Sequence, residues 1–203
     1  MKRYFAFLSV LCVSVVILLL ADATGDLRPT ADGGVEQWQN NANTSCASAT
    51  CYTEVNEASG ANCTTTPGDG TFNHSTATTN QTQRYDIDES TIPDGSTVTS
   101  AVIRVCAQRG GTQNVNFVMR FCVNGTCTDT ASNTAASAWA DFSGTSDFAD
   151  DVKDGTDDYE IGVQNTQARD LRVTALEVDV TYTPVAGGGP RRMFISRNLR
   201  PIP

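Results

Sequence analysis

The chain has 203 residues, of which 39% are hydrophobic and 18% are charged, and its formal net charge is −9. This length and apolar content are enough for one domain with a substantial core. The charge is uneven, because residues 24–185 carry 22 acidic and 8 basic side chains whereas residues 186–203 carry four arginines and no acid. The acidic body repels a phosphate backbone, so nucleic acid is excluded as a partner.

The N-terminus has the order of a secretory signal peptide. Lys2 and Arg3 precede an apolar run over residues 5–20, and Ala21-Asp22-Ala23 follows as a small-x-small cleavage site. The alternative is an uncleaved anchor, but the apolar run is shorter than the roughly 20 residues that span a bilayer. We therefore predict a signal peptide over residues 1–23, membrane contact only during export, and a secreted, extracellular or cell-surface protein.

Cysteine usage agrees with export. Loss of Cys12 with the signal peptide leaves six cysteines, an even number that predicts disulfides in an oxidising compartment, with buried free thiols as the alternative. Asn124-Gly125 predicts a two-residue type I′ hairpin, which places Cys122 opposite Cys127 at disulfide distance. Cys46 and Cys51 have the same spacing without the Asn-Gly turn, and a Cys63–Cys106 bond follows by elimination.

Several segments alternate between apolar and polar residues, as half-buried strands do. The longest are 97–107, 115–123 and 176–182, and the shorter ones are 35–39, 51–55, 84–87 and 159–163. Ser146–Lys153 is expected to form one short helix that Gly155 ends. Residues 56–83 are expected to form a long loop tied down by Cys63.

These elements predict an all-β fold. About eight strands with almost no helix must bury their apolar faces by packing sheet on sheet. We predict a single, disulfide-bridged, jelly-roll-like antiparallel β-sandwich over residues 24–185. Gly187-Gly188-Gly189-Pro190 then begins a Gly-rich linker and basic C-terminal tail over residues 186–203.

Aromatic and acidic residues give two candidate binding sites. Trp38, Trp139 and Phe142 are candidates for a sugar-stacking platform, with core packing as the commoner role of such residues. An Asp-rich stretch is a candidate calcium site, because calcium prefers oxygen ligands, although a solvated acidic turn has the same composition. Its candidate ligands are Asp147, Asp150, Asp151, Asp154, Asp157 and Asp158. No other cofactor is indicated.

Catalytic motifs are sparse. His74 is the single histidine and no G-x-S-x-G turn occurs, which disfavours a Ser-His-Asp hydrolase. Glu177-Val178-Asp179 resembles part of the E-x-D-x-x-E strand of laminarinase-like glycosidases, but the third acid is absent. We expect no enzymatic activity, with glycoside hydrolysis as the less favoured alternative.

Three stretches carry a family resemblance. They are Leu27-Arg28-Pro29-Thr30-Ala31-Asp32-Gly33, Ile92-Pro93-Asp94-Gly95-Ser96-Thr97-Val98, and Leu176 to Pro184. Together they resemble secreted bacterial and phage-associated jelly-roll domains of surface and fibre proteins. The resemblance implies a binding or structural role and transfers no catalytic residue.

The leading functional prediction is therefore a non-enzymatic extracellular structural or adhesive domain. In its assembly form, the C-terminal tail docks on a neighbouring copy to build a homo-oligomer or filament. The tail residues proposed for docking are Arg191, Arg192, Met193, Phe194 and Ile195. The alternative is a lectin-like carbohydrate-binding module that recognises surface glycans, with calcium as its candidate cofactor.

Overall fold

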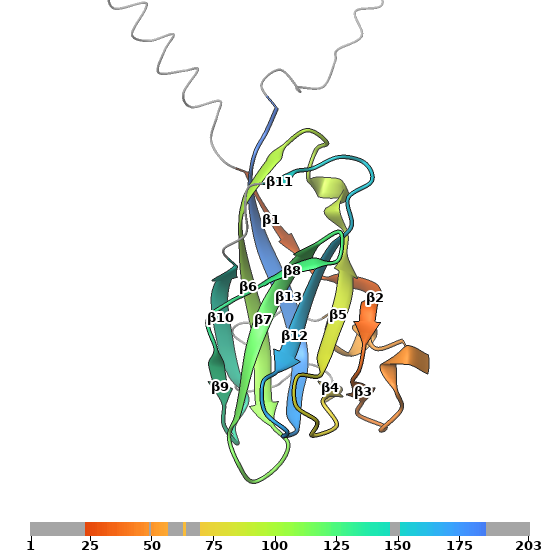
Figure 1. The fold of residues 1–203 in the computed structure, drawn as a ribbon, viewed down its shortest axis with the longest axis vertical. Helices are drawn as coiled ribbons and strands as arrows, with labels where there is room; N and C mark the ends of the chain where they lie inside the picture. The colour runs from red at the N-terminus through yellow and green to blue at the C-terminus, as the bar shows by residue number, and fades with distance from the viewer. Residues whose placement is uncertain (1–22, 49, 57–62, 64–69, 147–150, 186–203) are drawn as a thin grey trace, which may run out of the picture.

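The computed structural model describes residues 23–48, 50–56, 63, 70–146 and 151–185. Two antiparallel sheets pack face to face as a jelly-roll-like sandwich (Figure 1). The predicted signal peptide, apart from Ala23, and the predicted tail from residue 186 onward lie outside the described residues. Within the described part, no helix is long and apolar enough to cross a membrane.

The first sheet has seven strands in the order β10-β6-β13-β4-β3, with β1 also paired to β13 and β11 to β6. Its long central strands are β6 (Thr97–Arg109) and β13 (Leu171–Thr183), which run antiparallel along nearly their whole length. Its other strands are β1 (Ala23–Leu27), β3 (Gln39–Asn40), β4 (Asn73–His74), β10 (Ala140–Ser146) and β11 (Asp151–Val152).

The second sheet has six strands in the order β2-β5-β12-β7-β8, with β9 paired to β7. They are β2 (Pro29–Glu36), β5 (Thr82–Ile87), β7 (Val115–Val123), β8 (Thr126–Asp129), β9 (Asn133–Ala135) and β12 (Tyr159–Asn165). Three short 3₁₀ helices lie outside the sheets: η1 (Cys46–Ser48), η2 (Tyr52–Glu54) and η3 (Glu89–Thr91).

The core lies between the sheets and follows the predicted alternation, since successive side chains of a strand point to opposite faces. On β6, Ile103 and Val105 are fully buried, and on β7, Phe117 and Met119 face them from the other sheet. Leu176, Val178 and Val180 complete this layer from β13.

All three predicted disulfides are present. They join Cys46 to Cys51, Cys63 to Cys106 and Cys122 to Cys127. Asn124 and Gly125 both have positive φ, 50° and 78°, as a type I′ turn requires. This turn sets the β7–β8 register that places Cys122 opposite Cys127, with Cα atoms 4.0 Å apart.

Three local predictions are wrong. The helix expected at Ser146–Lys153 is replaced by strand at both of its described ends, because Ser146 ends β10 and Asp151–Val152 pair with β6, whereas residues 147–150 lie outside the described residues. The strand expected at residues 51–55 is the helix η2, which follows directly after the tight Cys46–Cys51 loop. The loop expected over residues 56–83 contains β4, where buried Asn73 donates to Cys51 O and Tyr85 Oη.

Candidate functional site

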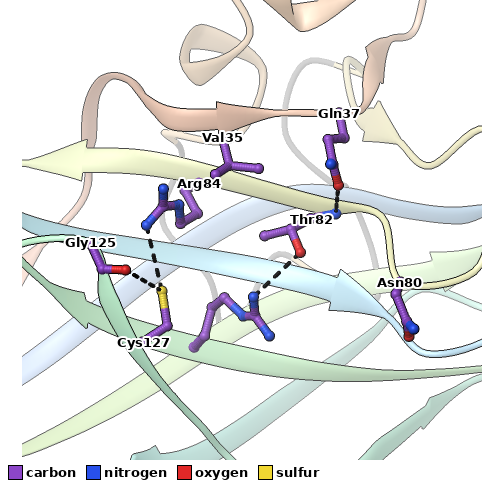
Figure 2. Close-up of a pocket in the computed structure, with 8 residues that line it drawn as sticks. Val35, Gln37, Asn80, Thr82, Arg84, Gly125 and Cys127 are labelled. Carbon is purple, nitrogen blue, oxygen red and sulfur yellow. Dashed lines mark hydrogen bonds between the residues drawn. The ribbon is translucent and has the colours of Figure 1, made fainter.

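A hollow of about 380 Å³ lies on the outer face of the six-stranded sheet, across β5, β12, β7 and β8 (Figure 2). We call it the outer groove. Its lining is mostly polar, and the residues that contribute to it are Val35, Gln37, Asn80, Thr82, Arg84, Arg120, Gly125 and Cys127.

Strand alternation explains why polar side chains line this face. On β5, Gln83, Tyr85 and Ile87 are buried, so Thr82 and Arg84 point to the opposite side. On β7, Met119 and Phe121 enter the core, and Arg120 between them points outward.

Gly162 forms the floor between the two arginines. It is the register partner of Arg84 on one side and of Arg120 on the other. A Cβ atom at Gly162 would lie 3.0 Å from Arg84 Cγ and 3.3 Å from Arg120 Cγ. Such a Cβ would also lie 2.6 Å from the Gln83 carbonyl oxygen, so the absence of a side chain leaves room for the β5 backbone and for both arginine stems.

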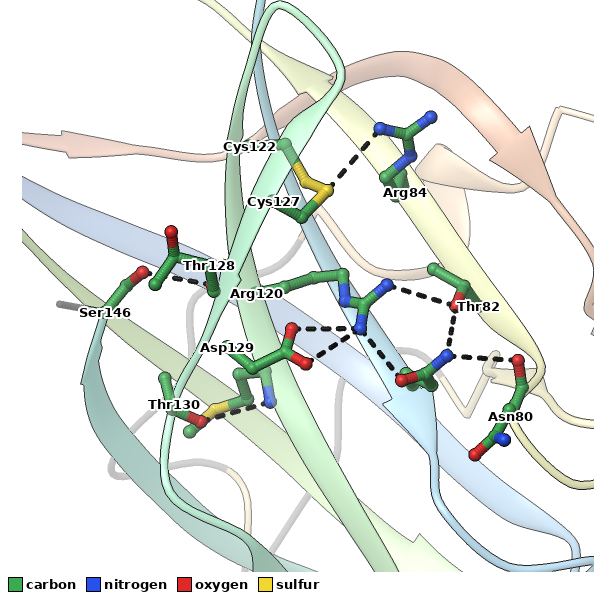
Figure 3. A network of polar contacts seen from close by, with 12 residues as sticks. Asn80, Thr82, Arg84, Arg120, Cys122, Cys127, Thr128, Asp129, Thr130 and Ser146 are labelled. Atoms are coloured by element: carbon green, nitrogen blue, oxygen red, sulfur yellow. Dashed lines mark hydrogen bonds and ion pairs between the residues drawn. A yellow bond between two sulfur atoms is a disulfide. The ribbon is translucent and has the colours of Figure 1, made fainter. Parts of the chain in front are cut away.

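Arg120 is the centre of a hydrogen-bond network (Figure 3). Its Nη2 donates to Asp129 Oδ2 at 3.0 Å and to Gln164 Oε1 at 2.8 Å, and its Nη1 donates to Thr82 Oγ1 at 3.4 Å. Gln164 Nε2 in turn donates to Thr82 Oγ1 and to the Asn80 carbonyl. The network holds these planar polar groups in fixed positions along the groove.

Arg84 is anchored by a buried carboxylate. Its Nη1 lies 2.7 Å from Glu160 Oε2, and the other Glu160 oxygen accepts a hydrogen bond from Gly34 N. Glu160 is 1% exposed, and a carboxylate this deeply buried needs such a partner. Each groove arginine is thus paired with one carboxylate, Arg84 with Glu160 and Arg120 with Asp129.

Asp86 lies beside the groove on β5, directly opposite Glu160 on β12. Burial, together with the nearby charges of Asp158 and Glu160, raises the pKa of Asp86 to about 6. Negative charge is therefore crowded at this end of the sheet, where like charges face each other across strands.

The three aromatic residues predicted as a platform are not brought together. Trp38 is 1% exposed and its indole Nε1 donates to the Gln81 carbonyl, so its assignment as a ligand-binding surface is wrong and core packing is its role. Phe142 packs edge-on against Phe117, with ring centroids 5.1 Å apart. Trp139 is half-buried against the Cys63–Cys106 bridge on the outside of the other sheet.

Four acidic residues of the predicted calcium site are described, and the carboxylates of three of them accept hydrogen bonds from neighbouring groups. Asp151 accepts from Tyr159 Oη, Asp154 from Thr156 N and Oγ1, and Asp157 from Asn124 Nδ2. Asp158 N donates to Asn124 Oδ1. Asp147 and Asp150 lie outside the described residues, so calcium binding by this turn stays a prediction.

Across the part of the chain that the structure describes, one group of three potential metal ligands converges, formed by Cys63, Cys106 and Asp141. Its two sulfur atoms are bonded to each other in a disulfide, which removes them as thiolate ligands.

Glu177 and Asp179, the incomplete glycosidase motif, lie on the outer face of the seven-stranded sheet. Arg104 Nη1 lies 3.8 Å from Glu177 Oε1 and also contacts Asp179 Oδ2. The two carboxylates therefore share one arginine and lie on the sheet opposite to the outer groove. The tail residues predicted for assembly, Arg191 to Ile195, lie outside the described residues.

The residues that form the outer groove could not be identified from the sequence alone. Arg84 and Arg120 look like solvent-facing positions of alternating strands, and only the inter-strand register places them on either side of Gly162. Gly162 in the middle of an apolar strand is the one local signal, since a glycine there marks a place where another group approaches closely.

No protein-family model and no curated protein matches the chain. Among solved structures, it is similar to CBM35 from Cellvibrio japonicus Abf62, at 15% identity and a TM-score of 0.41 over 77% of this chain and 92% of that one. It is also similar to the CBM22-1 xylan-binding domain from Paenibacillus barcinonensis Xyn10C, at 10% identity and a TM-score of 0.43 over 79% and 97% of the two chains. The Agl-KA catalytic domain matches at 11% identity and a TM-score of 0.40, with 85% of this chain and 30% of that one covered.

Proposed function

We propose that the protein is an extracellular carbohydrate-binding domain whose ligand lies in the outer groove. The observation that carries the proposal is the fixed pair of planar guanidinium groups of Arg84 and Arg120 in an open hollow, with Arg120 held by Gln164. Sugar hydroxyls donate and accept hydrogen bonds, and guanidinium and amide groups present matching donors and acceptors in fixed geometry.

The charge balance of the groove favours a neutral glycan. Glu160 and Asp129 already compensate the positive charges of Arg84 and Arg120. The remaining N–H groups of both arginines offer hydrogen bonds without a net attraction for an anion. Residues 24–185, with 22 acidic and 8 basic side chains, also repel anionic ligands over longer distances.

The three disulfides support an extracellular setting. Such bonds form and persist in oxidising compartments and are rare in the cytosol. An extracellular glycan is a ligand that a protein in this compartment meets.

A glycan array followed by calorimetric titration tests the proposal. We expect the protein to bind a neutral polysaccharide. Arg120→Gln should weaken binding about tenfold, which corresponds to about 1.4 kcal/mol, because it removes the central donor of the network. Thr82→Val, which keeps the side-chain shape, should weaken binding in the same direction.

Arg104→Gln is the matched control, since it removes one surface arginine from the opposite sheet. It should bind the glycan as the unmodified protein does. Absence of binding to every neutral glycan, or an equal loss in Arg104→Gln and Arg120→Gln, would overturn the proposal.

A further inference from the structure

The Cys122–Cys127 disulfide lies at the wall of the outer groove. Cys127 lines the hollow, and Figure 3 shows its sulfur beside the Arg84 guanidinium. Arg84 Nη1 donates to Cys127 Sγ at 3.6 Å. Cys122 is also the register partner of Glu160, so the bridge lies against the buried Arg84–Glu160 pair.

The position of this bridge differs from that of the other two. Cys46, Cys51, Cys63 and Cys106 are all buried, whereas Cys127 is partly exposed. The Cys122–Cys127 bond also closes a hairpin that the Asn-Gly turn and the β7–β8 pairing already close. It therefore restrains a segment that the turn already restrains, at a point where the Cys127 sulfur contacts Arg84.

We infer that the Cys122–Cys127 disulfide positions Arg84 for ligand binding and makes the affinity of the outer groove sensitive to reduction. This inference rests on the proposed carbohydrate-binding function. The sulfur fills the space between the β7–β8 hairpin and Arg84, so the guanidinium is confined between Cys127 and Glu160.

Reduction by a dithiol breaks the S–S bond and forms two S–H groups, while the dithiol loses two electrons and two protons and becomes its own disulfide. The two sulfur atoms then separate from bonding distance, about 2 Å, to van der Waals contact. The enlarged thiol pair displaces the Arg84 side chain from its position beside Cys127.

The test compares glycan affinity in three proteins by calorimetry: the unmodified protein, Cys122→Ser/Cys127→Ser, and Cys46→Ser/Cys51→Ser. The last pair is a matched control, because its bridge has the same sequence separation of 5 and does not line the groove. We expect the Cys122/Cys127 variant to bind about tenfold more weakly and the control to bind normally, with thermal unfolding recorded for both.

A coupling measurement separates positioning from general stabilisation. In a background of Arg84→Gln/Glu160→Gln, loss of the Cys122–Cys127 bridge should cause no further loss of affinity, since the group it positions is gone. A purely structural bridge would weaken binding by the same factor in both backgrounds, which would overturn the inference.

Mild dithiol treatment of the unmodified protein provides a readout that requires no variant. Mass spectrometry after thiol alkylation should show Cys122 and Cys127 labelled first, with affinity falling in step. A protein that binds glycan equally before and after this labelling would overturn the inference and leave the proposed function standing. A protein that binds no glycan at all would overturn both.

Discussion

At the residue scale, Asp86 is a group whose ionisation opposes folding. Its pKa is raised from 3.8 to about 6, first by burial and then by Asp158 and Glu160. Because the folded state holds the proton more tightly than the unfolded chain, ionised Asp86 destabilises the fold above about pH 6. This cost disappears as the pH falls below the ordinary value near 4.

We expect Asp86→Asn to stabilise the protein at pH 7–8. Asp86 is partly exposed, so solvent screening reduces the gain to on the order of 1 kcal/mol. The gain should shrink between pH 6 and pH 4 and vanish at lower pH. Urea unfolding of both proteins across this range measures it, and a gain that does not change with pH would contradict the assignment.

Asp88 is the matched control for this measurement. Hydrogen bonds from Ser90 lower the pKa of Asp88, whose carboxylate caps η3 by accepting from Ser90 N at 3.0 Å. Its contribution to stability is therefore present at neutral pH and is lost as the pH falls. Asp88→Ala should destabilise the protein at pH 7, opposite in sign to Asp86→Asn.

At the element scale, the Cys63–Cys106 bridge restrains the chain most. It joins residues 43 apart, whereas the other two bridges each join residues 5 apart. On the chain-entropy model the long ring contributes about 4 kcal/mol and a six-residue ring about 2 kcal/mol. Trp139 and Ala175 also pack around the long bridge, so its loss removes packing as well.

Cys63→Ser/Cys106→Ser should therefore lower the free energy of unfolding by about 2 kcal/mol more than Cys46→Ser/Cys51→Ser does. Urea unfolding of both variants at pH 7 under non-reducing conditions gives the comparison. An equal or smaller loss in the Cys63/Cys106 variant would contradict this ranking.

The long strands can be predicted from sequence because alternation repeats along them. β6, β7 and β13 each show this alternation over several residues. The hairpin at Asn124-Gly125 can also be predicted, because these two residues favour a type I′ turn. Two-residue strands such as β4 and β11 cannot be predicted this way. Their pairing depends on partners distant in the chain, as Asp151–Val152 pairs with Thr97 and Val98.

The outer groove is unpredictable for the same reason. Its strand residues Thr82, Arg84 and Arg120 are ordinary outward positions, and they come together only because Arg84, Gly162 and Arg120 share one register across three strands. The aromatic signal was misleading, because the Trp38 side chain is large enough to fill the core and has a carbonyl partner there.

At the scale of the whole molecule, both described ends of the chain leave from the same end of the sandwich. Ala23 pairs with Tyr182 near the end of β13, and Figure 1 shows both segments beside β11. The outer groove lies instead on the face of the six-stranded sheet. The proposed glycan site and the point where the described chain ends at residue 185 therefore lie on different parts of the sandwich.

Self-assembly through the tail stays a prediction with its own test. Four arginines in residues 186–203 face a body of net charge −14, so attraction between copies should be strongest at low salt and screened at high salt. We expect light scattering at low salt to show larger particles for the full chain than for a chain lacking residues 187–203, and particles of equal size in about 1 M salt.

Deletion of residues 187–203 should leave glycan affinity unchanged, because the groove is built entirely from residues 35–164. Equal particle sizes at low salt would contradict tail-driven assembly, while a loss of glycan affinity on deletion would show that the tail belongs to the binding site.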